Sequence, residues 1–383
     1  FFIGVFFGGI DVVSHGLFAA LSVLVVACPC AVGLATPVAL AAGLNKAARN
    51  HILIRDTSAL EQMRNVDVVV FDKTGTLTEG HPTVIGWLWA QGQEEHYKDV
   101  LLAAESTSDH PLAEAIVTAL EGEEQVIPAH LDGFENITGK GVRVAYQGAE
   151  YWVGSHKLLK DYQANLSDIL ADMLTQYESD GNSIVYFGRE NDLLAVIAIK
   201  DQLRVTSMEA IRELRIQDIE ICMLTGDGER TASSVAGSLG IMRFVADAMP
   251  DDKEDFIHKL QLQGKTVAMV GDGVNDAQAL SCADVSIAMG KGTDTLMDTA
   301  MITLRTSDLL LLPKVFRLSR QTVSLMYRNL FWAFIYNTVG IFVAAGVLYP
   351  VYDILLSPAL AGAAMALSCV SVALSSLRLS SRF

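Results

Sequence analysis

The chain has 383 residues, a length that predicts two or three domains. Its formal net charge at pH 7 is −16, which argues against a nucleic acid as a partner. Hydrophobic residues make up 51% of the chain, and their uneven distribution predicts both membrane-spanning and soluble parts.

Three long segments contain no charged residue, and each is long enough to cross a membrane, which takes about 20 mainly apolar residues. They are residues 17–44, 330–348 and 354–377. A fourth apolar segment, residues 1–10, is too short to span and lacks the pattern of a secretory signal. Because the chain begins without methionine, we expect it to be the remainder of a longer protein. A buried helix of a soluble protein is the alternative for any single segment.

Basic residues flank the predicted spans on one side only. The connections at residues 11–16 and 349–353 contain neither Lys nor Arg. The opposite ends of the spans carry Lys46, Arg49, Arg55, Lys314, Arg317, Arg320, Arg328, Arg378 and Arg382. By the positive-inside rule, the large segment between the first two spans and the C-terminus are expected to be cytoplasmic.

The first predicted span contains the sequence Ala27-Cys28-Pro29-Cys30. Proline removes a backbone donor and kinks a helix, which turns carbonyl groups and both thiols toward one cavity. Thiolates bind soft ions such as Cu(I) or the borderline ion Zn²⁺. The pattern predicts a metal site at Cys28 and Cys30, with small packing residues as the alternative interpretation.

The segment from residue 46 to residue 325 alternates short apolar runs with helical stretches, the pattern of an α/β domain. The expected strands are residues 66–71, 219–224, 266–270 and 285–288. Between the first two strands lies a long interruption, residues 80–190, rich in Gly, Asn and charged residues. It predicts an inserted domain with a sheet of its own.

The first strand leads into the sequence Asp72-Lys73-Thr74-Gly75-Thr76. It delivers Asp72 to a strand end, where a parallel sheet carries its chemistry. An aspartate there can attack a phosphoryl group and form an aspartyl-phosphate. Lys73 and the Thr74 hydroxyl can neutralise and hydrogen-bond the transferring oxygens.

Two later strands also end in turns suited to phosphate or to a metal. In Thr225-Gly226-Asp227, the Thr225 hydroxyl can hydrogen-bond a phosphoryl oxygen, and the glycine permits close backbone approach. Asp272 and Asp276 lie four residues apart and offer the oxygen ligands that Mg²⁺ prefers. Each turn alone is a common surface feature. Their recurrence after successive strands predicts one phosphoryl-transfer site at the sheet edge.

Together these motifs resemble the haloacid dehalogenase fold, and the string Asp-Lys-Thr-Gly-Thr-Leu-Thr from Asp72 resembles the phosphorylation motif of P-type ATPases. The resemblance implies that ATP phosphorylates Asp72. It implies catalytic contacts to the phosphoryl group from Lys73, Thr74, Thr225 and Lys253. It also implies an Mg²⁺ ion held by Asp72, Thr74, Asp272 and Asp276, supported by Asn275.

The resemblance further implies that the inserted domain binds ATP. The implied nucleotide contacts are Glu105, His110, Gly139, Gly141, Gly226 and Asp227. His110 lies in Ser108-Asp109-His110-Pro111, and a histidine can stack on adenine or hydrogen-bond to it. From the local sequence alone, a histidine at the start of a helix is the alternative interpretation.

The string from Ala27 to Pro37 resembles the transport helix of heavy-metal P-type ATPases. In the later spans the candidate ligands for the transported ion are Tyr336, Asn337, Met365 and Cys369. The last two are four residues apart and share a helix face. A zinc or cadmium exporter is expected to show a lysine in the second span and an aspartate in the third, and neither is present. The pattern therefore resembles the Cu(I)-transporting group, with Ag(I) as a chemically similar ion.

We therefore expect a membrane α-helical bundle joined to a cytoplasmic α/β phosphorylation domain of haloacid dehalogenase type, with an inserted α+β nucleotide-binding domain. The expected parts are helices at 1–45, the phosphorylation domain at 46–79 and 191–325, the nucleotide-binding domain at 80–190, and two helices with a tail at 326–383.

The resemblance implies ATP-driven export of Cu(I) or Ag(I) across a membrane, expected to be a bacterial inner membrane. Pumps of this kind need an actuator domain with a Thr-Gly-Glu loop, and this sequence contains no such loop. We expect the actuator and N-terminal metal-binding domains, membrane lipid and a copper-delivery chaperone to be its partners. The alternatives are a zinc or cadmium pump, a metal-binding or regulatory protein that does not transport, and a soluble phosphatase.

Overall fold

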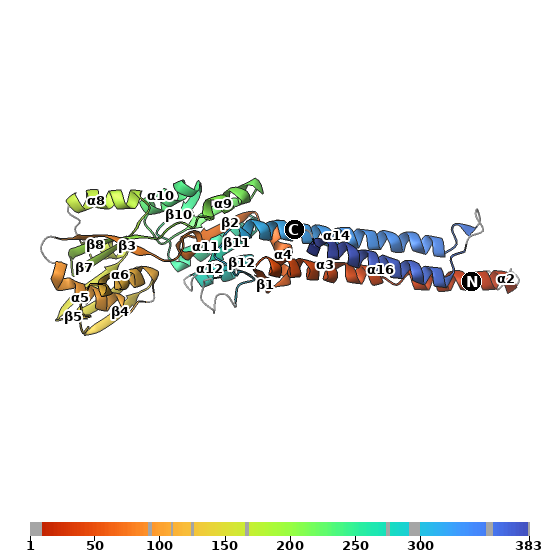
Figure 1. The fold of residues 1–383 in the computed structure, drawn as a ribbon, viewed down its shortest axis with the longest axis horizontal. Helices are drawn as coiled ribbons and strands as arrows, with labels where there is room; N and C mark the ends of the chain where they lie inside the picture. Colours follow the sequence, from red (N-terminus) through yellow and green to blue (C-terminus); the bar gives the residue numbers. More distant parts are fainter. Residues whose placement is uncertain are drawn as a thin grey trace. The chain divides into compact units, whose positions relative to one another are not determined.

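The computed structural model describes residues 10–90, 94–108, 110–123, 126–164, 168–272, 276–290, 299–349 and 355–381. The chain divides into two compact units (Figure 1). The first combines Phe1–Arg64 with Lys314–Phe383, and the second is Asn65–Pro313. Each unit has its own hydrophobic core.

The first unit is mainly helical. Its described elements are α2 (Ile10–Val26), α3 (Cys30–Arg49), β1 (Ile52–Ile54), α4 (Thr57–Gln62), a 3₁₀ turn (Met63–Asn65), α14 (Leu311–Ala344, which begins in the second unit) and α16 (Pro358–Ser381). Helix α3 begins directly after Pro29, which supplies no backbone donor to the preceding turn. The break between α2 and α3 therefore falls at the predicted proline.

Two helical stretches of the described chain are long and apolar enough to cross a membrane, by length and composition. They are Ser14–Arg49 and Pro358–Leu379, which overlap the first and third predicted spans. The second predicted span, residues 330–348, is not among them. It forms the end of α14, which stops at Ala344 and so includes only the first part of this apolar segment. The prediction that residues 330–348 span a membrane therefore stays a prediction.

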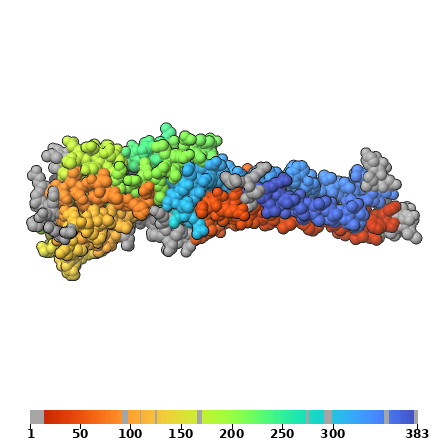
Figure 2. All heavy atoms as spheres, in the orientation of Figure 1, coloured from red at the N-terminus to blue at the C-terminus, as the bar shows by residue number. Residues whose placement is uncertain are grey.

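Small side chains let the helices of this unit approach one another. Ala31 and Ala35 of α3 form a buried cluster with Ala333 of α14 and Val372 of α16. A Cβ atom on Gly43 would lie 2.6 Å from the Thr322 hydroxyl oxygen, so a larger residue there would push α14 away from α3. Small residues at helix interfaces are typical of packing within membranes. The space-filling view shows α2 and α3 in red alongside α16 in dark blue (Figure 2).

The second unit contains a parallel sheet, as the sequence predicted. Within this unit the order is β13-β12-β11-β2-β9-β10. The strands are β2 (Val68–Asp72), β9 (Glu220–Leu224), β10 (Arg243–Val245), β11 (Val267–Gly271), β12 (Val285–Met289) and β13 (Ile302–Leu304). The four predicted strands are confirmed as β2, β9, β11 and β12. The sequence analysis missed β10 and β13, because three residues are too few to show a pattern.

Helices connect and cover these parallel strands. They are α9 (Ser207–Ile216), α10 (Glu229–Leu239), α11 (Pro250–Leu262) and α12 (Ala277–Cys282). Helix α10 buries Ala232, Val235, Ala236 and Leu239, the spacing of one helix face. It ends at Gly240, which has a left-handed backbone conformation (φ 68°) that glycine adopts without strain.

A second sheet is antiparallel, in the order β3-β8-β7-β6-β5-β4. Its strands are β3 (Thr83–Trp89), β4 (Gly133–Ile137), β5 (Gly141–Tyr146), β6 (Ala149–Gly154), β7 (Ser183–Arg189) and β8 (Asp192–Lys200). One core holds it to α5 (Glu94–Glu105) and α6 (Pro111–Glu121), and another to α7 (His156–Asp161) and α8 (Asp168–Ser179). The expected α+β insertion is confirmed as a fold.

Three of the expected domain boundaries, at residues 45, 190 and 325, fall inside a helix or a β-hairpin of the structure. Residue 190 lies in the turn between β7 and β8, which pair as a hairpin, so the second sheet continues to Lys200. Residues 45 and 325 lie inside α3 and α14, because each helix continues through them.

Strand register brings the predicted turns together. Asp72 at the end of β2 is level with Leu224 of β9, and Phe71 is level with Val270 of β11. Parallel strands carry their C-terminal ends at the same edge. The three turns that follow β2, β9 and β11 therefore meet beside Asp72.

Candidate functional site

Asp72 is the buried carboxylate at the centre of this edge, 6% exposed. Its Oδ2 accepts a hydrogen bond from the Thr74 backbone N–H at 3.0 Å. Its Oδ1 lies 2.5 Å from the Lys253 ammonium. Both oxygens are thus held in fixed directions before any substrate arrives, which suits a nucleophile.

Lys253, at the start of α11, pairs with two carboxylates. Its Nζ also lies 2.7 Å from Oδ1 of Asp276, the residue that precedes α12. Burial alone lowers the pKa of Lys253, but the charges of Asp72 and Asp276 outweigh burial and raise it above its usual value. The lysine therefore stays charged, which is compatible with the phosphoryl contact that the resemblance implies for it.

Three carboxylates converge beside this lysine. Oxygen atoms of Asp72, Asp272 and Asp276 all lie within 4.8 Å of one another. Burial, followed by the charges of Asp72 and Asp276, raises the pKa of Asp272 to about 7. Burial and then the charge of Asp72 raise the pKa of Asp276 to about 7, although Lys253 opposes this. Three neighbouring carboxylates share a single lysine, so their negative charge is only partly balanced. Such a group of oxygen donors fits a hard divalent cation such as Mg²⁺.

Gly75 makes room for Asp272. Its φ is 70°, and a Cβ atom there would lie 1.4 Å from Oδ2 of Asp272. Any side chain at this position would both strain the turn and displace the carboxylate. The glycine is therefore required by the site as well as by the turn.

Lys73 points toward the turn after β9. Its Nζ forms an ion pair with Asp227 and donates to the Ser183 hydroxyl at 3.0 Å. Burial by itself raises the pKa of Asp227, but the charge of Lys73 outweighs it and the pKa is lowered. The Thr225 hydroxyl donates to Asp227 at 2.9 Å. Lys73 therefore orders the predicted phosphate turn instead of contacting Asp72.

Gly226 lies at the tip of that turn and is exposed. A Cβ atom on it would meet only Ala248 O, at 3.7 Å, so the space beside its backbone is open. This arrangement leaves room for a phosphate oxygen near the Gly226 backbone, as the sequence suggested.

Glu105 and His110 mark the end of α5 and the start of α6. Glu105 is buried, and burial raises its pKa to about 7. The His110 ring is accessible to solvent, and its Nδ1 accepts from the Leu112 backbone N–H at 3.2 Å. Partial burial lowers the pKa of His110, and the charges of Asp227 and Lys73 act on it next. His110 therefore caps a helix and lies near enough to the phosphoryl site for the charges there to act on its pKa. Its neighbour Asp109 lies outside the described residues.

Gly139 and Gly141 form the turn between β4 and β5. Both have positive φ values, 69° and 142°. A Cβ atom on Gly139 would contact the Met249 side chain at 3.0 Å, and one on Gly141 would lie 2.1 Å from Val153 O. The turn thus lies against the start of α11, which carries Lys253.

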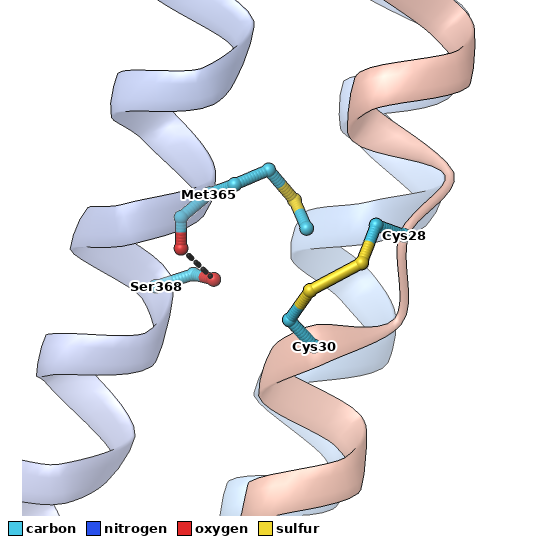
Figure 3. The surroundings of a disulfide bond; sticks show 4 residues. All are labelled: Cys28, Cys30, Met365 and Ser368. Carbon is cyan, nitrogen blue, oxygen red and sulfur yellow. Dashed lines mark hydrogen bonds between the residues drawn. A yellow bond between two sulfur atoms is a disulfide. The ribbon is translucent and has the colours of Figure 1, made fainter.

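The predicted sulfur site lies at the break between α2 and α3. Cys28 and Cys30 are exposed and joined by a disulfide, with Cα atoms 5.5 Å apart, inside the usual range for such a bond. The sequence analysis expected two thiols here. The structure corrects that expectation. The side chains of Cys28 and Cys30, on either side of Pro29, point to the same side of the chain, and their sulfur atoms are bonded to each other (Figure 3). Thiolate ligation therefore belongs to the reduced form of this pair.

The other predicted ligands differ in how they face this pair. Met365 extends from α16 toward Cys28 and Cys30 (Figure 3). Cys369 is a free thiol packed against the cluster of Ala31 and Val372. Tyr336 is half exposed and lies beside Trp332, with ring centroids 5.9 Å apart.

Asn337 is buried in part, and its Oδ1 has no hydrogen-bond partner among the described residues. A buried acceptor without a partner costs free energy, so it marks a position that suits an additional donor or cation. Figure 3 draws Met365 beside the two cysteines and does not draw Tyr336, Asn337 or Cys369.

Comparison with known proteins adds to this geometry. The haloacid dehalogenase-like hydrolase family matches residues 66–284, which contain every residue of the phosphoryl site. The chain belongs to the haloacid dehalogenase-like hydrolases. The earlier recognition of this fold from the Asp72 motif is confirmed.

Similarity also extends beyond the hydrolase domain. A copper-exporting P-type ATPase of Legionella pneumophila is 44% identical over 366 residues, covering 96% of this chain and 50% of the relative. A silver exporting P-type ATPase of Salmonella typhimurium is 45% identical over 371 residues, covering 96% of this chain and 44% of the relative. The chain therefore spans about half the length of these relatives.

A solved structure of a zinc-transporting PIB-type ATPase in the E2.Pi state has a TM-score of 0.64 and 34% identity. It covers 92% of this chain, and the chain covers 56% of it. Similarity at this level includes both the hydrolase domain and the helical unit.

Two functional residues of this hydrolase escaped the sequence analysis. Arg204 donates from Nε to Thr76 O at 3.0 Å and from Nη2 to Gly75 O, which fixes the turn after Asp72. Ser183 anchors Lys73 from the second sheet. Arg204 follows closely after the strand that ends at Lys200, and this position at a strand end could have indicated it. No feature of the sequence around Ser183 indicated its contact with Lys73.

Proposed function

We propose that this chain is the catalytic and ion-binding part of a P-type ATPase that exports Cu(I), with Ag(I) as an alternative cargo. The observation that carries the proposal is the Lys253 ammonium, held between Asp72 and Asp276 at the end of parallel strands. This arrangement supports a carboxylate nucleophile held beside a fixed positive charge.

In the proposed reaction, Asp72 attacks the terminal phosphorus of ATP, the bond to the bridging oxygen breaks, and ADP leaves. The Oδ2 atom stays oriented by the Thr74 N–H. In this proposal Lys253 balances the negative charge of the phosphoryl oxygens, and the Thr225 hydroxyl, which donates to Asp227 in this structure, turns to donate to one of them. Electrostatic positioning of this kind supplies most of the catalysis in phosphoryl transfer.

Mg²⁺ is the cofactor proposed for this site. Asp72, Asp272 and Asp276 would hold it, because their oxygens are crowded and two of them have raised pKa values. When bound, the ion neutralises negative charge on the phosphate groups. Thr74 remains a proposed contact, since its backbone N–H already donates to Asp72.

ATP is proposed to bind at the second sheet, near Glu105, His110 and the turn with Gly139 and Gly141. The support is that His110 is close enough for Asp227 and Lys73 to act on its pKa. The Gly139 turn approaches Met249, just before α11. Both features would place a nucleotide between the second sheet and the phosphoryl site.

The choice of ion rests on the donor atoms in the helical unit. The reduced pair Cys28 and Cys30 with Met365 offers three sulfur atoms, and soft monovalent ions prefer sulfur. The names of the copper- and silver-exporting relatives support this choice. Zinc is the second candidate, because the related solved structure is described as zinc-transporting.

A membrane location with cytoplasmic catalytic domains follows from this proposal and from the two apolar helices. Membrane lipid, the remaining domains of a pump and a copper-delivery chaperone are its proposed partners. The bacterial inner membrane is the proposed site.

The test is incorporation of γ-labelled phosphate from ATP into membranes that contain the reduced protein, with Cu(I), Ag(I) or Zn²⁺. We expect acid-stable, hydroxylamine-labile label that requires Asp72 and is stimulated by Cu(I) or Ag(I). Asp72→Asn should abolish it, and Asp180→Asn, an exposed aspartate on the surface, should not.

Comparing the label obtained with each metal ion distinguishes a copper or silver pump from a zinc pump. Stimulation by Zn²⁺ alone would replace the copper proposal by a zinc pump. Label that ignores every metal would point to a catalytic domain uncoupled from the sulfur site. Absence of label from the native chain would overturn the enzymatic proposal and favour a regulatory protein.

A further inference from the structure

A second cluster of metal-type ligands lies on the surface of the hydrolase domain, away from the three aspartates. Glu254 and His258 are four residues apart on α11, and Cys282 ends the neighbouring helix α12. One ligand atom from each residue lies within 4.8 Å of the others. The cluster therefore unites a carboxylate, an imidazole and a thiol from two helices.

Two of the distances between these ligand atoms match the edges of a tetrahedron around a metal ion. With zinc bonds of about 2.0–2.3 Å, ligand atoms around one tetrahedral ion lie about 3.3–3.8 Å apart. The Cys282 Sγ to Glu254 Oε1 distance is 3.4 Å, and the His258 Nε2 to Glu254 Oε1 distance is 3.5 Å. Two edges thus already have the required length without any rearrangement.

Gln261 contacts both His258 and Cys282 and so helps to fix their orientation. Its Oε1 lies 3.1 Å from Nδ1 of His258, and its Nε2 donates to the Cys282 backbone carbonyl at 2.9 Å. With the proton on Nδ1, the lone pair of His258 is on Nε2, the atom that faces Glu254. An amide that fixes the tautomer of a ligating histidine is a typical outer partner of a metal site.

We propose that Glu254, His258 and Cys282 bind a borderline divalent cation such as Zn²⁺, with the fourth position open to water. The mixed donor set excludes the hard ions Mg²⁺ and Ca²⁺, which prefer oxygen, and gives Cu(I) only one sulfur. His258 is half exposed and Glu254 is about one-third exposed, so the ion exchanges with solvent. This is an exchangeable site, distinct from the Mg²⁺ site and from the transported ion.

The position of this cluster gives binding a consequence for catalysis. Lys253 directly precedes Glu254, and Asp276 precedes the helix that Cys282 ends. A bound ion would tie α11 to α12 and so fix the pair that holds Asp72. This consequence rests on the proposed function, whereas metal binding itself does not.

Co²⁺ is the probe, because a tetrahedral Co²⁺–thiolate centre absorbs in the visible and near-ultraviolet. The full chain carries Cys28→Ala and Cys30→Ala to remove the sulfur site, and is kept with excess Mg²⁺ and a non-thiol reductant. We expect one equivalent of Co²⁺ with a thiolate charge-transfer band, displaced by Zn²⁺. Cys282→Ser should remove the band, and Cys369→Ser should leave it unchanged.

His258→Gln provides a test at an exposed position, where loss of folding is not expected. It should weaken Zn²⁺ binding at least about 100-fold, and Gln261→Leu about 10-fold. His130→Ala removes another exposed histidine and should change neither value. A band that survives Cys282→Ser, or Zn²⁺ affinity that is unchanged in His258→Gln, would overturn the proposal whether or not Asp72 accepts phosphate.

Discussion

The phosphoryl site and the sulfur site hold their donor atoms in opposite ways. Around Asp72, strand ends fix the backbone, and Lys253 and the Thr74 N–H fix the two carboxylate oxygens. At the sulfur site, a proline interrupts the helix, the cysteines are exposed, and Met365 reaches them on a flexible side chain. Under the proposed function, the first arrangement suits fixed geometry and the second suits ligand exchange.

This difference indicates which property each site controls under the proposed function. Phosphoryl transfer needs atoms placed to a fraction of an ångström, which buried charge pairs provide. An ion that is to be released needs soft donors without a rigid cage, and a broken helix provides that. Substitutions at the first site should therefore act on the rate, and those at the second on metal dependence.

The largest effect is expected for Lys253→Met. It leaves Asp72 and Asp276 as neighbouring buried carboxylates without their cation, so label from ATP should fall at least about 100-fold. Breaking a buried pair also costs about 3–5 kcal/mol of stability. Phosphate incorporation and thermal unfolding measure the two effects. Lys259→Met, further along α11, is the matched control, and an equal loss there would contradict the role of Lys253.

Gly75→Ala should come next. The new methyl group collides with Asp272 and the backbone must keep a positive φ, so phosphorylation should fall about 100-fold and require more Mg²⁺. Titration of the label with Mg²⁺ checks this. Gly228→Ala is the control, since nothing lies within 4 Å of its added Cβ atom. Unchanged Mg²⁺ dependence in Gly75→Ala would show that Asp272 does not hold the ion.

Cys30→Ser tests the sulfur site. We expect the apparent Cu(I) affinity for stimulating the label to fall at least about 10-fold, while label without metal is unchanged. The comparison with Cys369→Ser is informative, because that thiol packs against apolar helix residues and should matter little. If Cys369→Ser were the more damaging change, the third span and not the broken helix would carry the ion.

Glu105→Gln should have the smallest effect. Burial raises the pKa of Glu105 to about 7, so its ionisation opposes folding, and stability should fall as pH rises from about 4.5 to about 7. Glutamine removes that penalty and should stabilise the protein by about 1–3 kcal/mol above this range, with little change below it. Melting temperatures at about pH 5 and pH 8 test the sign, and Glu114→Gln at α6 is the control.

The sequence predicted most of the phosphoryl site because its residues directly follow strands. Asp72, Thr225 and Asp272 each come at the end of an apolar run, and parallel strands bring such positions to one edge. The fold class followed from the same alternation of strands and helices. Local pattern and tertiary position agree in this sheet, so the fold and the meeting of these turns could be predicted, and the chemical roles of the residues stay a prediction.

Other features depend on contacts that no local pattern encodes. Ser183 meets Lys73 across 110 residues of chain, and its environment is set by how two sheets pack. Helix α14 continues through the expected boundary at 325 because a helix does not end where hydropathy changes. The short strands β10 and β13 exist through pairing with longer neighbours.

The bond between Lys73 and Ser183 has a further consequence. Ser183 belongs to the antiparallel sheet, whereas Lys73 and Asp227 belong to turns of the parallel sheet. Lys73 therefore links the two sheets through its ammonium group, and the residue is 3% exposed. If the two sheets move apart when a nucleotide binds, the hydrogen bond between Lys73 and Ser183 must break. The NMR signal of the Lys73 ammonium protons in solution would then change with this movement.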